Sequence, residues 1–339
     1  MGTVKDLVVI KDPEEKKPGE GIFVFTDNFS VFDYGRMPDL IQGKGQALCL
    51  ISAYFFEKLA EKDIRNHYIG LLDNGKTKYI DELESPTNKM KIVLFRVIRP
   101  KRIGNRYDYS VFKEIKGNYL IPLEIIYRNY LPKGSSVFKR LKEGKLTLEE
   151  LGLKEHPKPG QKLEKPIIDV STKLENVDRY ISWEEAMEIS GLSTDEIEYI
   201  KKVSMKINEL ISSEIEKVGL INEDGKFEFA IDYDRRIFLV DAVGTPDECR
   251  FSFEGTPISK EVIRMYYRKT SWFKEIEKAK ESGTFTNLPK PPLLPPSFKN
   301  LVSEMYKSVC NMITGIKFFE ARPIKEIIGE LREFIGDQI

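Results

Sequence analysis

Histidine and cysteine are scarce in this sequence, with two and three residues among 339. Cys49, Cys249 and Cys310 are odd in number and form no C-x-x-C pair, so we expect neither a disulfide framework nor a zinc site. His67 and His156 stand in polar, turn-like segments, which predicts that both lie at the surface. An enzyme of this composition would work with carboxylates, lysines and arginines, and these favour phosphate chemistry with a hard metal ion.

The sequence also lacks a net charge and any long apolar run. Its 54 basic residues balance its 54 acidic ones, which argues against a protein held on nucleic acid by bulk electrostatics. No apolar stretch approaches the roughly 20 residues of a membrane span, and residues 1–17 lack the apolar run of a signal peptide. With 41% hydrophobic residues the chain is too apolar for a disordered protein. We therefore expect a soluble cytoplasmic protein without nucleic-acid or membrane partners.

Apolar patterns in the first 130 residues predict strands and a helix. Runs rich in β-branched and aromatic residues, typical of strands, occupy residues 7–10, 22–25, 92–95 and 123–127. After Gly43-Lys44-Gly45 the apolar residues fall on one helical stripe, which predicts a helix. Residues 1–130 are therefore predicted to form a strand-rich lobe.

The remainder of the chain has a different composition. Residues 131–168 are rich in Lys, Gly and Pro, which is typical of a boundary between lobes. A capping box at Ser193–Glu196 predicts the start of a helix. Five prolines within residues 288–296 predict an extended strap that leads into a last helix. The fold class is therefore expected to be α+β, with residues 131–339 as a mixed second lobe.

A predicted hairpin, residues 227–231 and 237–240, carries the strongest group of candidate residues. Glu228 lies in its first strand and Asp241 ends its second strand, so the hairpin can bring these two carboxylates close together. Two carboxylates at the end of a sheet suit Mg²⁺, which prefers oxygen ligands and keeps room for phosphate oxygens. The alternative is a solvated hairpin with ordinary surface acids.

Two further segments have the composition of anion-binding sites. Residues 245–250, Thr-Pro-Asp-Glu-Cys-Arg, form a turn that positions an arginine just beyond the acids. Arg128 is followed by Gly134-Ser135-Ser136 and by Lys139-Arg140, where amides, hydroxyls and cations could converge on a phosphate. An ordinary turn and a solvated basic loop are the respective alternatives.

Taken in order, these and neighbouring segments resemble the motifs of one enzyme family. They are G-T-V-K-D-L (2–7), T-D-N-F-S-V-F-D (26–33), G-K-G (43–45), P-L-E-I-I-Y-R-N-Y (122–130), S-T-K-L-E (171–175) with Asp178, K-F-E-F (226–229) and D-A-V-G-T-P-D-E-C-R (241–250). The tail is similar as well, with S-K-E-V-I-R (259–264) and I-T-G (313–315). The family is that of SAICAR synthetase, phosphoribosylaminoimidazole-succinocarboxamide synthase, and the resemblance spans nearly the whole chain.

The resemblance implies a two-lobed α+β fold with ATP in the cleft between the lobes. It implies an ATP-dependent ligase that joins the carboxylate of carboxyaminoimidazole ribotide (CAIR) to the amine of L-aspartate in de novo purine biosynthesis. The products would be SAICAR, ADP and phosphate, ATP and Mg²⁺ would be the cofactors, and homo-oligomer formation is left open. Phosphoryl transfer to a carboxylate needs positioning and charge neutralisation, which suits a sequence poor in histidine.

The same resemblance implies roles for individual residues. For ATP it implies Gly2, Thr3, Lys5, Lys173, Glu228 and Asp241, and for the metal ion Asp178, Glu228 and Asp241. For the ribotide and the other substrate it implies Lys44, Arg128, Ser135, Ser136, Lys226, Arg250, Lys260 and Arg264. Catalytic roles are implied for Lys173, Lys226 and Asp247.

The sequence departs from the family pattern at several positions. Ala242 stands where the family usually has glutamate, and Asn28 replaces the usual arginine. The G-S turn carries extra residues, so Ser135 and Ser136 compete for one role, and residues 101–120 have no clear counterpart. Another acid near in sequence could compensate for the missing glutamate. The candidates are Asp232, Asp234 and Glu248.

Two alternative functions remain compatible with these departures. One is a ligase of the same fold that joins a different carboxylate and amine. The other is a nucleotide-binding homologue without turnover. Retention of four implied active-site residues argues against the second alternative. They are Lys173, Glu228, Asp241 and Arg250.

Overall fold

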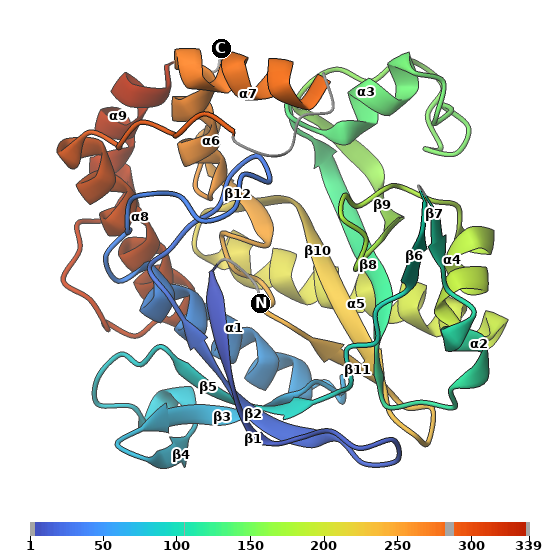
Figure 1. Ribbon diagram of the computed structural model, residues 1–339. Helices are drawn as coiled ribbons and strands as arrows, with labels where there is room; N and C mark the ends of the chain where they lie inside the picture. Colours follow the sequence, from blue (N-terminus) through green and yellow to red (C-terminus); the bar gives the residue numbers. More distant parts are fainter. Residues whose placement is uncertain (1–3, 105, 282–287, 337–339) are drawn as a thin grey trace.

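Two larger antiparallel sheets form the frame of the molecule (Figure 1). The computed structural model describes residues 4–104, 106–281 and 288–336. Strands and helices are both abundant and the strand pairs are antiparallel, so the α+β class predicted from the sequence is confirmed. Within the described ranges no helix has the length and apolar content needed to cross a membrane.

The first sheet is built from strands within residues 5–94. Its spatial order is β1 (Lys5–Lys11), β2 (Gly19–Phe25), β5 (Lys89–Leu94), β3 (Tyr68–Asp73) and β4 (Lys76–Lys78). The three strands that the sequence predicts in this region are present as β1, β2 and β5. β1 lies at the edge of the sheet and pairs only with β2 along this order. Its position at the edge brings it to the cavity described below.

Helix α1 (Lys44–Ala60) packs between the first sheet and α8 (Pro296–Thr314). Because both sides are covered, its apolar residues are buried around most of the helix. The carboxylate of Asp27 accepts hydrogen bonds from the N–H groups of Gly43 and Gly45, at 3.1 and 2.9 Å, and so satisfies amides that the helix leaves free. A Cβ at position 45 would lie 2.6 Å from the main chain of β2. Glycine therefore lets the helix begin directly against the sheet.

The second sheet carries most of the charged residues of interest. Its spatial order is β13 (Thr256–Pro257), β12 (Cys249–Phe253), β10 (Ile221–Ile231), β8 (Tyr119–Leu131) and β9 (Gln161–Thr172), and β11 (Ile237–Val240) pairs with β10. The predicted hairpin is confirmed as β10 and β11. Helix α5 (Thr194–Lys217) lies against one face of this sheet (Figure 1). It begins at the predicted capping box, because Ser193 and Glu196 each bond the other's main-chain N–H through the side chain.

The remaining elements lie in the connections and at the end of the chain. They are a short 3₁₀ helix (Ile80–Glu82), β6 (Lys101–Ile103), β7 (Arg106–Asp108), α2 (Val111–Glu114), α3 (Ser136–Lys142), α4 (Trp183–Ser190), α6 (Glu261–Arg268), α7 (Ser271–Glu281) and α9 (Ile324–Ile335). The sequence predicts α8 as the last helix, and this prediction is wrong. Helix α9 follows it and buries Ile324, Ile327 and Leu331 against α6 and α8.

Main-chain contacts join the segment before β3 to β11 of the second sheet. The N–H of His67 donates to the carbonyl of Leu239 at 3.0 Å, and the N–H of Leu239 donates to the carbonyl of Arg65 at 2.9 Å. The division into residues 1–130 and 131–339 stays a prediction. Strand β8 (Tyr119–Leu131) pairs with β9 and β10 and so belongs to the second sheet. By sheet membership, the boundary between the two parts would therefore lie before residue 119.

Candidate functional site

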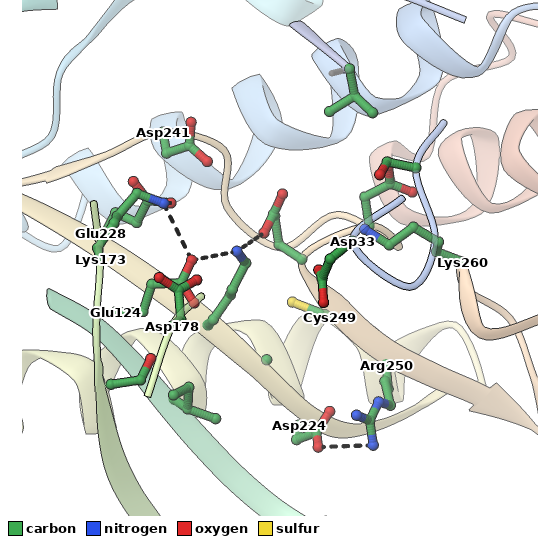
Figure 2. A pocket seen from close by; sticks show the side chains of 18 of the residues that line it. Asp33, Glu124, Lys173, Asp178, Asp224, Glu228, Asp241, Cys249, Arg250 and Lys260 are labelled. Atoms are coloured by element: carbon green, nitrogen blue, oxygen red, sulfur yellow. Dashed lines mark hydrogen bonds and ion pairs between the residues drawn. The ribbon is translucent and has the colours of Figure 1, made fainter. Parts of the chain in front are cut away.

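A cavity of about 1000 Å³ is lined by residues of both sheets. The first sheet and its N-terminal approach contribute a mostly apolar wall. It consists of Val4, Lys5, Leu7, Val9 and Phe23. The second sheet and its loops contribute charged residues, many of which Figure 2 shows pointing toward one another. They include Glu124, Arg128, Lys173, Asp178, Asp224, Lys226, Glu228, Asp241, Asp247, Glu248, Arg250 and Lys260.

Two lysines bridge the glutamates at one end of the cavity. Glu124 of β8 and Glu228 of β10 are register partners, so their side chains leave the same face of the sheet. The Nζ of Lys173 lies 3.3 Å from Glu124 Oε1 and also contacts Glu228 Oε1. The Nζ of Lys226 lies 2.6 Å from Glu124 Oε1 and 3.4 Å from Glu248 Oε2. The buried carboxylates therefore have cationic partners, which buried charge requires.

Asp241 connects the two sheets through its side chain. The Nζ of Lys5, on β1, lies 2.6 Å from Asp241 Oδ1. Asp241 directly follows β11 and has a φ of 71°, in the left-handed region that residues other than glycine rarely adopt. The backbone therefore turns sharply at the point where it presents this carboxylate to the first sheet.

His67 lies behind Asp241 and is buried, with 2% of its surface exposed. The expectation of a surface position is therefore wrong for His67, whereas His156 is exposed as predicted. The Nε2 of His67 lies 3.0 Å from the main-chain oxygen of Asp241. Burial lowers the pKa of His67 to about 4, so its imidazole is neutral at neutral pH. The polar neighbours of His67 in the sequence do not reveal this, because packing between the sheets decides its burial.

Neighbouring charges shift the pKa values of the acids in opposite directions. Burial and the charge of Asp241 raise the pKa of Glu228 to about 7. Burial acts on Asp241 as well, but Lys5 and Lys173 outweigh it and hold the pKa of Asp241 well below its usual range. Partial loss of solvent and a neighbouring carboxylate raise the pKa of Asp178 to about 6. An added cation would therefore be favourable beside Glu228 and Asp178, where negative charge is only partly balanced.

Arg128 and Arg250 converge on one carboxylate at the other end of the cavity. Their Nη1 atoms lie 3.6 and 3.4 Å, respectively, from Asp224 Oδ2, and Figure 2 shows the pair of Arg250 and Asp224 apart from the lysine group. Arg128 also donates to the hydroxyls of Ser135 and Ser136, at 3.3 and 3.2 Å. Two guanidinium groups with neighbouring hydroxyls have the geometry that recognises a phosphate.

The two serines of the G-S turn occupy different places. The hydroxyl of Ser135 accepts a hydrogen bond from the N–H of Val137 at 3.4 Å and caps α3, and the residue is 5% exposed. Ser136 lines the cavity, and its hydroxyl lies 2.8 Å from that of Tyr180. Ser136 is therefore the serine that faces the cavity. A ligand contact of Ser135 stays a prediction.

Lys44 lies behind the cavity wall. Its side chain is fully buried, and its Nζ lies 2.7 Å from Asp247 Oδ2 and 3.2 Å from the carbonyl of Asn28. Asp247 lines the cavity and accepts a hydrogen bond from the hydroxyl of Tyr306 at 2.6 Å. Although burial opposes it, Lys44 and Lys260 hold the pKa of Asp247 far below its usual range. A contact between Lys44 and a substrate stays a prediction. The ion pair with Asp247 lets Lys44 hold that carboxylate in position.

Most of the residues that the sequence singles out line this cavity. They are Lys5, Arg128, Ser136, Lys173, Asp178, Lys226, Glu228, Asp241, Asp247, Arg250, Lys260 and Arg264. Gly2 and Thr3 fall outside the described residues. Glu124 and Asp224 also line the cavity, and neither was predicted as a site residue. Glu124 stands inside the motif P-L-E-I-I-Y, which is a signal that could have found it, whereas Asp224 follows no recognisable pattern.

The acids considered as replacements for the missing glutamate differ in position. Asp232 and Asp234 pair with Arg236 in the turn between β10 and β11, at the opposite end of the hairpin from Asp241. Glu248 lines the cavity. Among the described residues no group of three or more His, Cys, Asp or Glu side chains is arranged to hold a metal ion by itself.

Comparisons with known proteins show what this chain is similar to. A protein-family model described as SAICAR synthetase matches residues 2–279. A protein of Archaeoglobus fulgidus, provisionally named a phosphoribosylaminoimidazole-succinocarboxamide synthase, is 52% identical over 336 residues, which cover 99% of this chain and 100% of the relative. The Thermoplasma volcanium protein named as this synthase is 36% identical over 306 residues, with 88% of this chain and 94% of the relative covered.

Two solved structures share the fold. A SAICAR synthase from Saccharomyces cerevisiae complexed with SAICAR is 25% identical, with a TM-score of 0.63 and 94% of both chains covered. A type-2 SAICAR synthetase in complex with ADP is 25% identical, with a TM-score of 0.58, and the match covers 86% of this chain and 99% of that one.

Proposed function

Because this chain belongs to the SAICAR synthetase family, we propose that the cavity is a ligase active site with a nucleotide side and a ribotide side. The chain is an ATP-dependent ligase of de novo purine biosynthesis. The reaction joins the carboxylate of CAIR to the amine of L-aspartate and gives SAICAR, ADP and phosphate. The observation that supports this division is the kind of cation at each end of the cavity. Lysines pair with carboxylates at one end, and two arginines share one carboxylate at the other.

The nucleotide is assigned to the side of β1. Lys5 and Lys173 supply cations for the phosphate groups, and Leu7, Val9 and Phe23 supply the apolar surface that a base requires. The related synthetase with bound ADP supports nucleotide binding by this fold. Gly2 and Thr3 complete the assignment as predicted contacts.

Mg²⁺ fits this side by the chemistry of the available donors. Glu228 and Asp241 offer hard oxygen ligands, with Asp178 as a third acidic side chain on the cavity wall. Mg²⁺ is usually held by one or two carboxylates together with phosphate oxygens. When bound, Mg²⁺ would neutralise charge on the phosphates of ATP.

The ribotide phosphate is assigned to Arg128 and Arg250. Both guanidinium groups lie in the cavity wall, and the hydroxyl of Ser136 lies beside Arg128. Asp224 holds the two arginines toward each other. An arriving phosphate would meet two planar forks that are already oriented, which lowers the entropy cost of binding.

The residues of the chain serve the reaction through position and charge. A carboxylate oxygen of the ribotide attacks the γ-phosphorus of ATP, ADP leaves, and Lys173 neutralises charge on the transferred group. The amine of L-aspartate then attacks the acyl phosphate, loses a proton and expels phosphate. Lys226 holds the reacting carboxylate, and Asp247, kept ionised by Lys44, orients the amine.

A second candidate function keeps the fold and changes the amine. It is motivated by Ala242, which replaces the family glutamate beside Asp241 and is buried. Glu248 favours the first candidate, because it lines the cavity and contacts Lys226, so an acid is supplied close by.

The test is ATP-dependent ligation by the purified chain. Phosphate release and product mass are measured with ATP, CAIR and L-aspartate, and each substrate is omitted in turn. We expect release only with all three. Consumption of another amino acid while L-aspartate is inert would support the second candidate. Nucleotide binding without turnover for any amine would contradict both.

A further inference from the structure

We propose that His67 is a positioning residue for the nucleotide side of the site: it holds the backbone of Asp241 in its left-handed conformation and so aims the carboxylate at Lys5. This inference rests on the proposed function, which assigns Asp241 to Mg²⁺-ATP. His67 touches no reacting group, and it acts only through the residue that it holds.

The contact has one possible direction. The main-chain oxygen of Asp241 can only accept a hydrogen bond, so a bond over the 3.0 Å from Nε2 of His67 requires the tautomer in which Nε2 carries the hydrogen. Asp241 has a φ of 71°, and a residue in this region persists only when its surroundings determine it. A buried donor fixed on the carbonyl of that residue is such a determinant.

The ring of His67 is itself held in place. It packs edge to face between Phe23 and Phe56, with centroid distances of 5.6 and 5.3 Å. The main chain of His67 is also fixed. Its N–H donates to the carbonyl of Leu239, and its carbonyl accepts a hydrogen bond from the N–H of Val93 at 2.7 Å. Both sheets therefore fix the donor before it reaches Asp241.

Two residues from the side of the first sheet therefore contact Asp241. Lys5 contacts its side chain from β1, and His67 contacts its main chain from the loop before β3. On the far side, the N–H of Val243 donates to the hydroxyl of Ser52 at 3.1 Å and anchors the chain just after the turn. The carboxylate orientation is therefore set by the first sheet, although Asp241 itself follows the second.

Two substitutions separate the hydrogen bond from the packing of the ring. His67→Gln keeps an N–H donor at a reach similar to that of Nε2 and loses the ring, whereas His67→Phe keeps the ring and loses the donor. His156→Phe is the matched control, because His156 is the exposed histidine of the chain. Asp241→Asn is the positive control, since asparagine tolerates the left-handed region but has no charge.

The readouts are the Kd of ADP with Mg²⁺ by calorimetry, the Mg²⁺ concentration for half-maximal turnover, and the melting temperature. We expect His67→Phe to weaken both Mg²⁺-dependent constants by about tenfold or more, the usual effect of removing a partner that orients a ligand. His67→Gln should retain most of the affinity, and His156→Phe all of it.

The outcomes separate this inference from the proposed function. If His67→Phe binds Mg²⁺-ADP like the unmodified chain, the positioning role is wrong. It is also wrong if His67→Gln binds Mg²⁺-ADP more weakly than His67→Phe and its melting temperature is lower to a matching extent. If Asp241→Asn also leaves Mg²⁺-ADP binding unchanged, the assignment of Asp241 in the proposed function is wrong instead.

Discussion

Glu124 and Glu228 face each other across β8 and β10, and Lys173 contacts both carboxylates. Directly opposed like charges destabilise a strand pair unless counter-ions separate them. The two glutamates therefore fix the position of Lys173, and the positive charge of Lys173 offsets the repulsion between the two carboxylates. The arrangement makes Glu124 a residue that orients cations, although no role was predicted for it from the sequence.

Glu124→Gln tests this relationship. The substitution keeps the size of the side chain and removes the charge that orients Lys173 and Lys226. We expect kcat to fall by up to about a hundredfold, because small displacements of catalytic groups have effects of this size. Steady-state kinetics with ATP and CAIR varied would check it. An unchanged kcat would show that the two lysines hold their positions without Glu124.

Asp241→Asn tests the metal assignment. It removes one negative charge from a site proposed for a hard cation and frees Lys5 from its ion pair. Turnover dependent on Mg²⁺ should fall by at least about tenfold, since loss even of a residue that orients a metal ligand has an effect of this size. The melting temperature shows whether the fold is kept. A variant with normal turnover would contradict the placement of Mg²⁺ beside this residue.

Arg250→Lys tests the ribotide side. Lysine keeps the charge but loses the planar fork that can bind two phosphate oxygens. Loss of one charge-assisted hydrogen bond costs about 1.5–3 kcal/mol, so KM for the ribotide should rise by at least about tenfold. KM for ATP should hardly change. Arg322→Lys is the control, because Arg322 pairs with Glu304 and Glu330 at the surface. A larger rise in KM for ATP than in KM for the ribotide would show that the nucleotide and ribotide sides are assigned the wrong way round.

Lys44→Met tests the buried pair behind the wall. It leaves Asp247 buried without its closest cation, which costs about 3–5 kcal/mol of unfolding free energy when a buried pair is broken. Lys58→Met, on the exposed side of α1, should cost far less, since its pair with Glu61 is solvated. Urea unfolding of the two variants at pH 7 would check the difference.

The same pair predicts a pH dependence of stability. The pKa of Asp247 is lower in the folded chain than its ordinary 3.8, so its contribution to stability is present above about pH 4 and is lost as the pH falls further. In Lys44→Met the burial of Asp247 would instead raise its pKa. The destabilisation by this substitution should therefore be largest at neutral pH and shrink toward pH 4. Equal destabilisation at pH 7 and pH 4.5 would contradict the raised pKa that is expected for Asp247 in the variant.

Local patterns predicted the elements that depend on local physics. The strands β1, β2, β5 and β8, the β10–β11 hairpin and the capping box of α5 all follow from apolar spacing or from side chains within three residues. Helix α9 was not predicted, although its buried residues have helical spacing. The cytoplasmic location and a homo-oligomer stay predictions.

Burial of polar groups could not be predicted in this way. His67 has polar neighbours in the sequence, and only the approach of Phe23 and Phe56 from other elements buries it. Glu124 lies in an apolar strand, and its partners come from positions 173 and 226. Asp232 and Asp234 are close to Asp241 in sequence but lie at the other end of an antiparallel hairpin. Sequence distance is a poor guide wherever strands reverse direction.

The position of β8 between β9 and β10 has a consequence for how the chain folds. β8 ends at Leu131, whereas its partner β10 begins at Ile221. During synthesis the first sheet can form early from neighbouring segments, but β8 keeps an unpaired edge until about ninety further residues have left the ribosome. Pairing over such sequence distances is slow. A growing chain between these two points therefore exposes an apolar strand edge, the species on which we expect chaperones or aggregation to act.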